Sequence, residues 1–150
     1  MKVSAQTNIN STKEKVWEVI TDIENSVNVI SGIINIEILN PVGDNLVGLK
    51  WKETRKMFGK EAVEVMWVTH SKKYDYYQTR AESHGAIYLS RLNITDKNNG
   101  VVTLEMSFEG QAASLPAKIM SGVFGVFMKK SMKKVLEVDL EDIKKSCEAQ

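Results

Sequence analysis

The chain has one cysteine, Cys147, so it cannot form an internal disulfide. With no cysteine pair at metal-binding spacing either, the composition suits a reducing cytoplasm. No apolar run reaches the length of about 18 residues that crosses a bilayer, and the opening MKVSAQTNIN lacks the apolar segment of a signal peptide. We therefore expect a soluble cytoplasmic protein.

A strong charge of one sign is also lacking, since 20 basic and 19 acidic residues give a formal net charge of +1. Nucleic-acid binding depends on clustered lysine and arginine, and the lysines between 129 and 134 are followed directly by acidic residues between 137 and 142. We therefore expect no nucleic-acid partner.

The sequence lacks the common signatures of catalysis and of cofactor binding. It has no Gly-x-Ser-x-Gly elbow, no phosphate-binding loop and no dinucleotide fingerprint. Its two histidines, His70 and His84, have no ligand partner at metal-binding spacing. No catalytic residue, metal site or cofactor is therefore assigned.

The chain is long enough to form one domain over residues 1–150, and its 43% hydrophobic content is typical of a globular protein. Alternation over residues 3–9 predicts a strand. The stretch Ser11-Thr12-Lys13-Glu14 matches a capping box with Ser11 as N-cap, which predicts a helix over residues 12–22. A short second helix is expected over residues 25–31.

From Ile33 onward the apolar residues recur with a period of two, and short turn sequences such as Phe58-Gly59-Lys60 separate the runs. Such short separators require antiparallel neighbours. After Gly110 the pattern is helical to the end. The order predicts an α+β fold: a seven-stranded antiparallel sheet curled around a long C-terminal helix, with two short helices between strands 1 and 2. The later six strands are expected over residues 34–39, 47–56, 61–70, 76–83, 86–95 and 101–109.

The segment Leu115–Met128 is apolar almost all the way round, with Lys118 as its only charge. A helix of this kind needs apolar surroundings on both faces, and the sheet can cover only one of them. The other face must meet a partner, a membrane or a cavity that holds an apolar ligand. The lysines that follow this segment would suit transient contact with an anionic membrane surface.

Three stretches resemble the helix-grip superfamily, which contains START domains, birch-pollen-allergen-like proteins and polyketide cyclase/dehydrase-like families. They are the strand, cap and helix start Ile9–Asp22, the entry into the last strand Gly100–Leu104, and the closing helix Leu136–Glu148. The Trp-rich segment usual after the first helix is replaced here by residues 26–31. The resemblance implies the helix-grip fold and binding of sterols, lipids, polyketides, hormones or quinones, with a minority of cyclases.

Strand alternation selects the residues that would line the cavity. It places Val47, Leu49 and Trp51 inward with Glu53 and Arg55, then Val63, Val65 and Trp67, then Val102, Leu104, Met106 and Phe108. Large rings and flexible thioethers commonly line apolar sites, whereas the alternative is an ordinary core. The candidate ligand contacts are Trp51, Trp67, Tyr77, Tyr88, Met106, Phe108, Ile119, Met120, Val123, Phe124 and Phe127.

Glu53, Arg55 and Arg80 are candidate polar anchors for a ligand head group, and the alternative is that they form charge pairs on a solvated face. The leading hypothesis is binding or carriage of a hydrophobic small molecule between the sheet and the C-terminal helix. Two others remain: a cyclase or dehydratase using Glu53, Arg55, Tyr77 and Tyr88, and an interaction module that docks through the apolar helix. The chain is expected to be a monomer or a weak homodimer.

Overall fold

The computed structural model describes residues 1–83, 85–112 and 123–149, with the backbone alone for residue 112 and for residues 123–127. Its strands and helices follow the predicted order. They are β1 (Lys2–Ile9), α1 (Lys13–Thr21), the 3-10 turn η1 (Ile23–Asn25), α2 (Ser26–Val29), β2 (Ile33–Asn40), β3 (Lys50–Met57), β4 (Lys60–Lys72), β5 (Tyr76–Ser83), β6 (Ala86–Asp96), β7 (Val102–Ala112) and α4 (Val123–Glu148).

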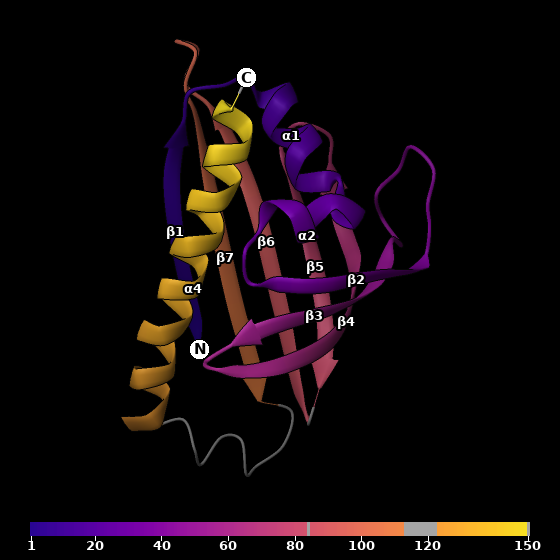
Figure 1. The fold of residues 1–150 in the computed structure, drawn as a ribbon, viewed down its shortest axis with the longest axis vertical. Helices are drawn as coiled ribbons and strands as arrows, with labels where there is room; N and C mark the ends of the chain where they lie inside the picture. The colour runs from indigo at the N-terminus through magenta and orange to yellow at the C-terminus, as the bar shows by residue number, and fades with distance from the viewer. Residues whose placement is uncertain (84, 113–122, 150) are drawn as a thin grey trace.

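The strands form one antiparallel sheet in the order β1-β7-β6-β5-β4-β3-β2. In Figure 1, β2, β3 and β4 cross in front of the more upright strands β5, β6 and β7, so the sheet is strongly curved, and α4 runs along β1. The two edges of the sheet are therefore β1 and β2. The predicted helix-grip architecture is confirmed.

Several predicted boundaries are wrong by one to three residues, and two of these differences have a clear physical reason. The N-cap of α1 is Thr12 rather than Ser11, because the Thr12 hydroxyl accepts the Lys15 N–H at 3.1 Å. Strand β3 begins at Lys50 rather than Val47, because Gly48 has a φ of 95° that a regular strand does not adopt. The apolar segment 115–122, predicted to be helical, lies outside the described residues.

The hairpin between β3 and β4 has a two-residue turn, Phe58-Gly59, in which both φ angles are positive, at 54° and 77°. Such turns match the twist of a tight antiparallel hairpin. The turn pairs Met57 with Lys60, and the unbroken register then pairs Glu53 with Glu64. The turn therefore decides which face of the sheet each side chain of β4 joins.

A tightly packed core occupies one end of the concave face. Its most deeply buried side chains are less than 2% exposed and come from β1, α1, β4, β7 and α4: Ile9, Val16, Val68, Val102, Leu104 and Leu140. Helix α1 is fixed to the sheet by the Tyr77 hydroxyl, which donates to the Ile20 carbonyl at 3.0 Å. The C-terminal half of α4 buries Ile143 and Cys147 in the same core.

The thiol of Cys147 is expected to be unreactive in the folded protein. Burial raises its pKa to about 11. Compared with an ordinary thiol, this lowers the thiolate fraction near pH 8 by about two orders of magnitude. Iodoacetamide labelling followed by mass spectrometry should therefore be at least about 100-fold slower in native protein than in guanidinium chloride. Equal rates in the two conditions would contradict the burial of this residue.

Candidate ligand-binding site on the concave face

The strand register assigns the side chains to the two faces of the sheet, because residues directly opposite each other share a face and neighbours along a strand alternate. Buried Ile9 lies opposite Val102, and the same face continues across β6, β5, β4 and β3 to Trp51. This is the concave face, against which α4 packs (Figure 1). It includes Glu53, Arg55, Met66, Tyr77, Thr79, Tyr88, Ser90, Met106 and Phe108.

The concave face is covered unevenly. At the end away from α1, the apolar side chains point inward, yet they are only half-buried. We call this region the open end; it comprises Met57, Met66, Tyr88, Met106 and Phe108. The Tyr88 and Phe108 rings stack at a centroid distance of 5.6 Å with an interplanar angle of 23°. The Tyr88 ring packs directly over Gly110, where an added Cβ would lie 3.5 Å from the ring, an ordinary van der Waals contact.

Methionines are prominent in this region, and sequence reasoning identified only Met106 among them. Met57, like Met106 and Phe108, packs on a cluster that contains Met132 of α4, and Met66 packs on the main core. Flexible thioethers adapt to ligands of differing shape. The alternation that places Glu53 and Arg55 inward continues to Met57, so the sequence pattern could have predicted that Met57 also faces inward.

A buried charged cluster links β3 to α4. The Arg55 guanidinium contacts Asp139 of α4 twice, with Nη1–Oδ1 at 3.1 Å and Nη2–Oδ2 at 3.0 Å. Its Nε donates to Glu53 Oε2 at 3.3 Å, and Trp51 Nε1 donates to the other oxygen of Glu53 at 3.4 Å. The Arg55, Glu53 and Asp139 side chains are 13%, 14% and 6% exposed. The alternative of a solvated charge pair is therefore wrong for Arg55 and Glu53.

The cluster holds two carboxylates and one guanidinium, and the pKa directions follow from that imbalance. Burial would lower the pKa of Arg55, but Asp139 and Glu53 raise it above its ordinary value. Burial raises the pKa of Asp139; Arg55 opposes this only in part, because the charges of Glu53 and Asp142 raise it as well. The guanidinium therefore stays charged, and the carboxylates compete for it.

Tyr77 also faces inward, but its hydroxyl is already engaged. Burial, together with the nearby charge of Glu53, raises its pKa above the ordinary value. Its proton is donated to the Ile20 carbonyl. Tyr77 is therefore a buried structural group, whereas the half-buried Tyr88 lies in the open end.

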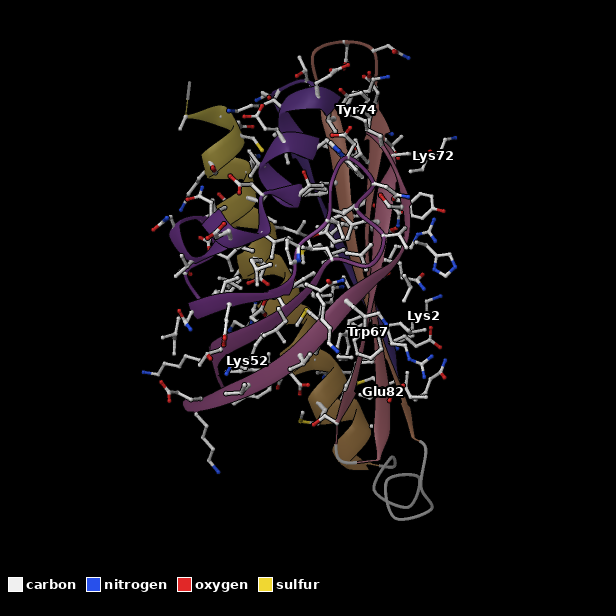
Figure 2. All side chains as sticks on the ribbon, turned by 90° about the vertical axis from the view of Figure 1, so that its right-hand side faces the viewer. Lys2, Lys52, Trp67, Lys72, Tyr74 and Glu82 are labelled. Atoms are coloured by element: carbon white, nitrogen blue, oxygen red, sulfur yellow. The ribbon has the colours of Figure 1, made fainter. Side chains whose placement is uncertain are left out.

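The expectation that Val63, Val65 and Trp67 face inward is wrong. Trp67 pairs with Lys50 and Arg80 on the convex face, and the Lys50 Nζ lies 5.7 Å from its ring centroid. The two-residue turn places Met66, the neighbour of Trp67 along β4, on the concave face instead. Trp67 is labelled in Figure 2. Val63 is 56% exposed and Val47, before β3, is 42% exposed.

Arg80 lies on the same convex face, where its Nη2 contacts Glu82 at 2.6 Å. Of the three candidate anchors, only Glu53 and Arg55 therefore reach the concave face. Trp51 lies inward but is 3% exposed within the packed core. Ile119 and Met120 lie outside the described residues, and Val123, Phe124 and Phe127 are described as helix backbone alone. A role for these residues in binding stays a prediction.

Two kinds of site are absent from the part of the chain that the structure describes. No group of three histidine, cysteine, aspartate or glutamate side chains in this part of the chain is arranged to hold a metal ion. No helix among these residues is long and apolar enough to cross a membrane.

Arg55→Met would leave two buried carboxylates without their guanidinium, and we expect a loss of about 3 kcal/mol in unfolding free energy near pH 7. The folded-state pKa of an unpaired buried carboxyl lies above its unfolded value. Its contribution is therefore favourable at low pH and is lost as pH rises through the folded pKa. Urea unfolding should show the deficit growing from pH 4.5 to pH 7.5. The control Arg80→Met, which removes an exposed pair, should lose under about 1 kcal/mol at both values.

Comparison with known proteins agrees with this architecture. Among solved structures, the chain is similar to a START superfamily protein from Mycobacterium smegmatis, with 17% identity, a TM-score of 0.82, and 99% and 97% of the two chains covered. A protein from Thermus thermophilus has 13% identity, a TM-score of 0.82, and coverage of 99% and 98%. The Zhui aromatase/cyclase from Streptomyces sp. R1128 has 13% identity, a TM-score of 0.73, and coverage of 99% and 93%.

At these identities the structural likenesses establish the fold alone. A search of curated protein sequences finds no significant match. The family model described as polyketide cyclase/dehydrase and lipid transport, however, matches residues 1–148. The chain therefore belongs to the polyketide cyclase/dehydrase and lipid transport family.

Proposed function

We propose that this protein binds a hydrophobic small molecule against the open end of the concave face, between the sheet and α4. The observation that carries the proposal is the incomplete burial of Met57, Met66, Tyr88, Met106 and Phe108, which all belong to the inward side of the sheet. Apolar side chains in that position gain stability only when something covers them. Within the described part of the chain nothing covers them completely, and a ligand can supply that cover.

The composition of the open end favours an apolar ligand of variable shape. Thioethers adapt to their contacts, and the stacked Tyr88 and Phe108 rings offer a flat apolar surface. Burying about 300 Å² of apolar surface would contribute roughly 7 kcal/mol before ordering costs, and micromolar affinity corresponds to about 8 kcal/mol. One or two polar contacts would complete such an affinity. The Tyr88 hydroxyl is one group placed to make them.

Ser90 and Ser107 offer a matched pair of variants for testing the site. Ser90 lies on β6 opposite Phe108, on the concave face, whereas Ser107 lies on β7 opposite Arg91, on the convex face. Both are half-buried. Ser90→Trp should fill the open end and weaken binding by at least about tenfold, a change of about 1.4 kcal/mol. Ser107→Trp should leave the affinity unchanged.

Binding would be measured by displacement of a fluorescent fatty acid with unlabelled fatty acid, sterol, quinone and aromatic polyketide probes. Circular dichroism would establish that both variants fold. Absence of binding of every probe to the wild type, with no bound lipid in native mass spectrometry of the purified protein, would contradict the proposal. So would equal affinities for Ser90→Trp and the wild type.

A second candidate function is a cyclase-type enzyme that uses the same surface. It is favoured by the inward position of Glu53, Arg55, Tyr77 and Tyr88. Because Arg55, Glu53 and Tyr77 are held by hydrogen bonds to other protein groups, Tyr88 is the hydroxyl best placed for proton transfer.

Tyr88→Phe keeps the ring and removes the hydroxyl. It should abolish turnover of a poly-β-keto probe if the protein is an enzyme, and weaken probe binding by no more than about tenfold, the contribution of one hydrogen bond, if it is a carrier.

A further inference from the structure

Strand β1 is an edge of the sheet, and the direction of its backbone groups can be assigned from Met1, the residue just before it. The Met1 amino group donates to the Gly110 carbonyl at 3.0 Å, and the Gly110 N–H donates to the Met1 carbonyl at 2.8 Å. In an antiparallel pair, residues that exchange both bonds alternate with residues whose polar groups point the other way. The register of β1 with β7 has no shift. The N–H and C=O groups of Ser4, Gln6 and Asn8 therefore point outward from the sheet.

Only one end of this edge is capped within the described part of the chain. Asn10 is the next residue in the alternation after Asn8, and its N–H donates to Glu148 Oε2 of α4 at 2.7 Å. No hydrogen bond from the described residues reaches the backbone of Ser4 or Gln6. Natural edge strands are usually protected by charges, prolines or bulges. Residues 3–9 of β1 have none of these.

A groove of about 630 Å³ runs along this open edge. One wall is β1 from Ser4 to Thr7 together with Glu105 of β7, and the other is the flank of α4. The α4 residues that line it are Lys133, Glu137, Leu140 and Glu141. The lining therefore carries three carboxylates against one ammonium group, and it contains the outward-pointing backbone groups of Ser4 and Gln6.

We propose that this groove binds an extended, basic peptide segment of a partner protein, which adds to β1 as a further strand. The backbone groups of Ser4 and Gln6 supply the main-chain hydrogen bonds, as in other cases of strand addition to a sheet edge. The surplus of carboxylates selects lysine or arginine in the peptide. A second copy of the chain would bring the same surplus of carboxylates to the contact, so the charge disfavours self-association.

The geometry also sets the pattern of the peptide. Side chains of an added strand alternate between the two faces, at about 3.4 Å per residue. The peptide side chains that point to the concave side would contact Glu137 and Glu141. We therefore expect a basic residue at every second position of the peptide. Suitable probes are a blocked heptapeptide of alternating lysine and valine and its counterpart of alternating glutamate and valine.

Amide hydrogen exchange measured by NMR tests the proposed mode directly. Saturation with the lysine–valine peptide should slow exchange at the N–H groups of Ser4 and Gln6 by about tenfold or more. The N–H groups of Ala5 and Thr7 already bond to β7, so their exchange should change little. Binding that protects none of the outward N–H groups would overturn the proposal.

Gln6→Pro removes one outward N–H and breaks no hydrogen bond to β7. An edge strand tolerates proline at a position of this kind. Fluorescence anisotropy should show at least about tenfold weaker binding of the lysine–valine peptide to this variant. The double variant Glu137→Lys, Glu141→Lys should prefer the glutamate–valine peptide. Glu18→Lys, an exposed change of the same kind on α1, is the control and should retain the wild-type preference.

Three results would overturn the proposal: no binding of the lysine–valine peptide to the wild type, equal binding to Gln6→Pro and the wild type, or dimerisation in light scattering that Gln6→Pro abolishes. Gln6 lies outside the open end of the concave face, so Gln6→Pro should bind the apolar probes as the wild type does. The two proposals can therefore fail independently.

Discussion

The buried guanidinium of Arg55 is the constraint on which the arrangement of α4 depends. A charge in this position is tolerated only with partners, and those partners come from two elements, Glu53 of β3 and Asp139 of α4. The bidentate contact with Asp139 holds α4 at one rotation about its axis. That rotation turns Leu136 and Ile143 toward the sheet.

The same rotation of α4 decides which of its other side chains face the edge groove. Residues one turn before and after a given position share its face, whereas those two positions away point elsewhere. With Asp139 inward, Glu137 and Glu141 face the groove beside β1. The ion pair and the buried apolar side chains of α4 therefore agree on one rotation, and that rotation also turns Glu137 and Glu141 toward the edge groove.

The two surfaces proposed for binding differ in their physical basis. The open end of the concave face consists of apolar rings and thioethers that are half-buried, and a ligand there would be held by the hydrophobic effect. The edge groove is polar, and an added strand there would be held by main-chain hydrogen bonds and by charge. They lie on different parts of the molecule, so a small molecule and a peptide need not compete.

Family membership agrees with the first surface and is silent on the second. The family description names polyketide cyclase, dehydrase and lipid transport, and the solved structures similar to this chain share its fold. Within such a fold, chemistry depends on which inward polar groups are free to act. In this chain the side chains of Arg55, Glu53 and Tyr77 already bond to protein partners, which limits the inward polar groups that are free to act.

The sequence alone determined the order of the elements, the antiparallel sheet and the inward position of Arg55, because periodicity and turn residues are local properties. It could not decide the face of Trp67 or the partner of Arg55. The first depends on the two-residue turn at Phe58-Gly59, where one residue more or less exchanges the two faces of β4. The second depends on contact between residues 84 positions apart in the chain, which only the packing of α4 on the curved sheet brings together.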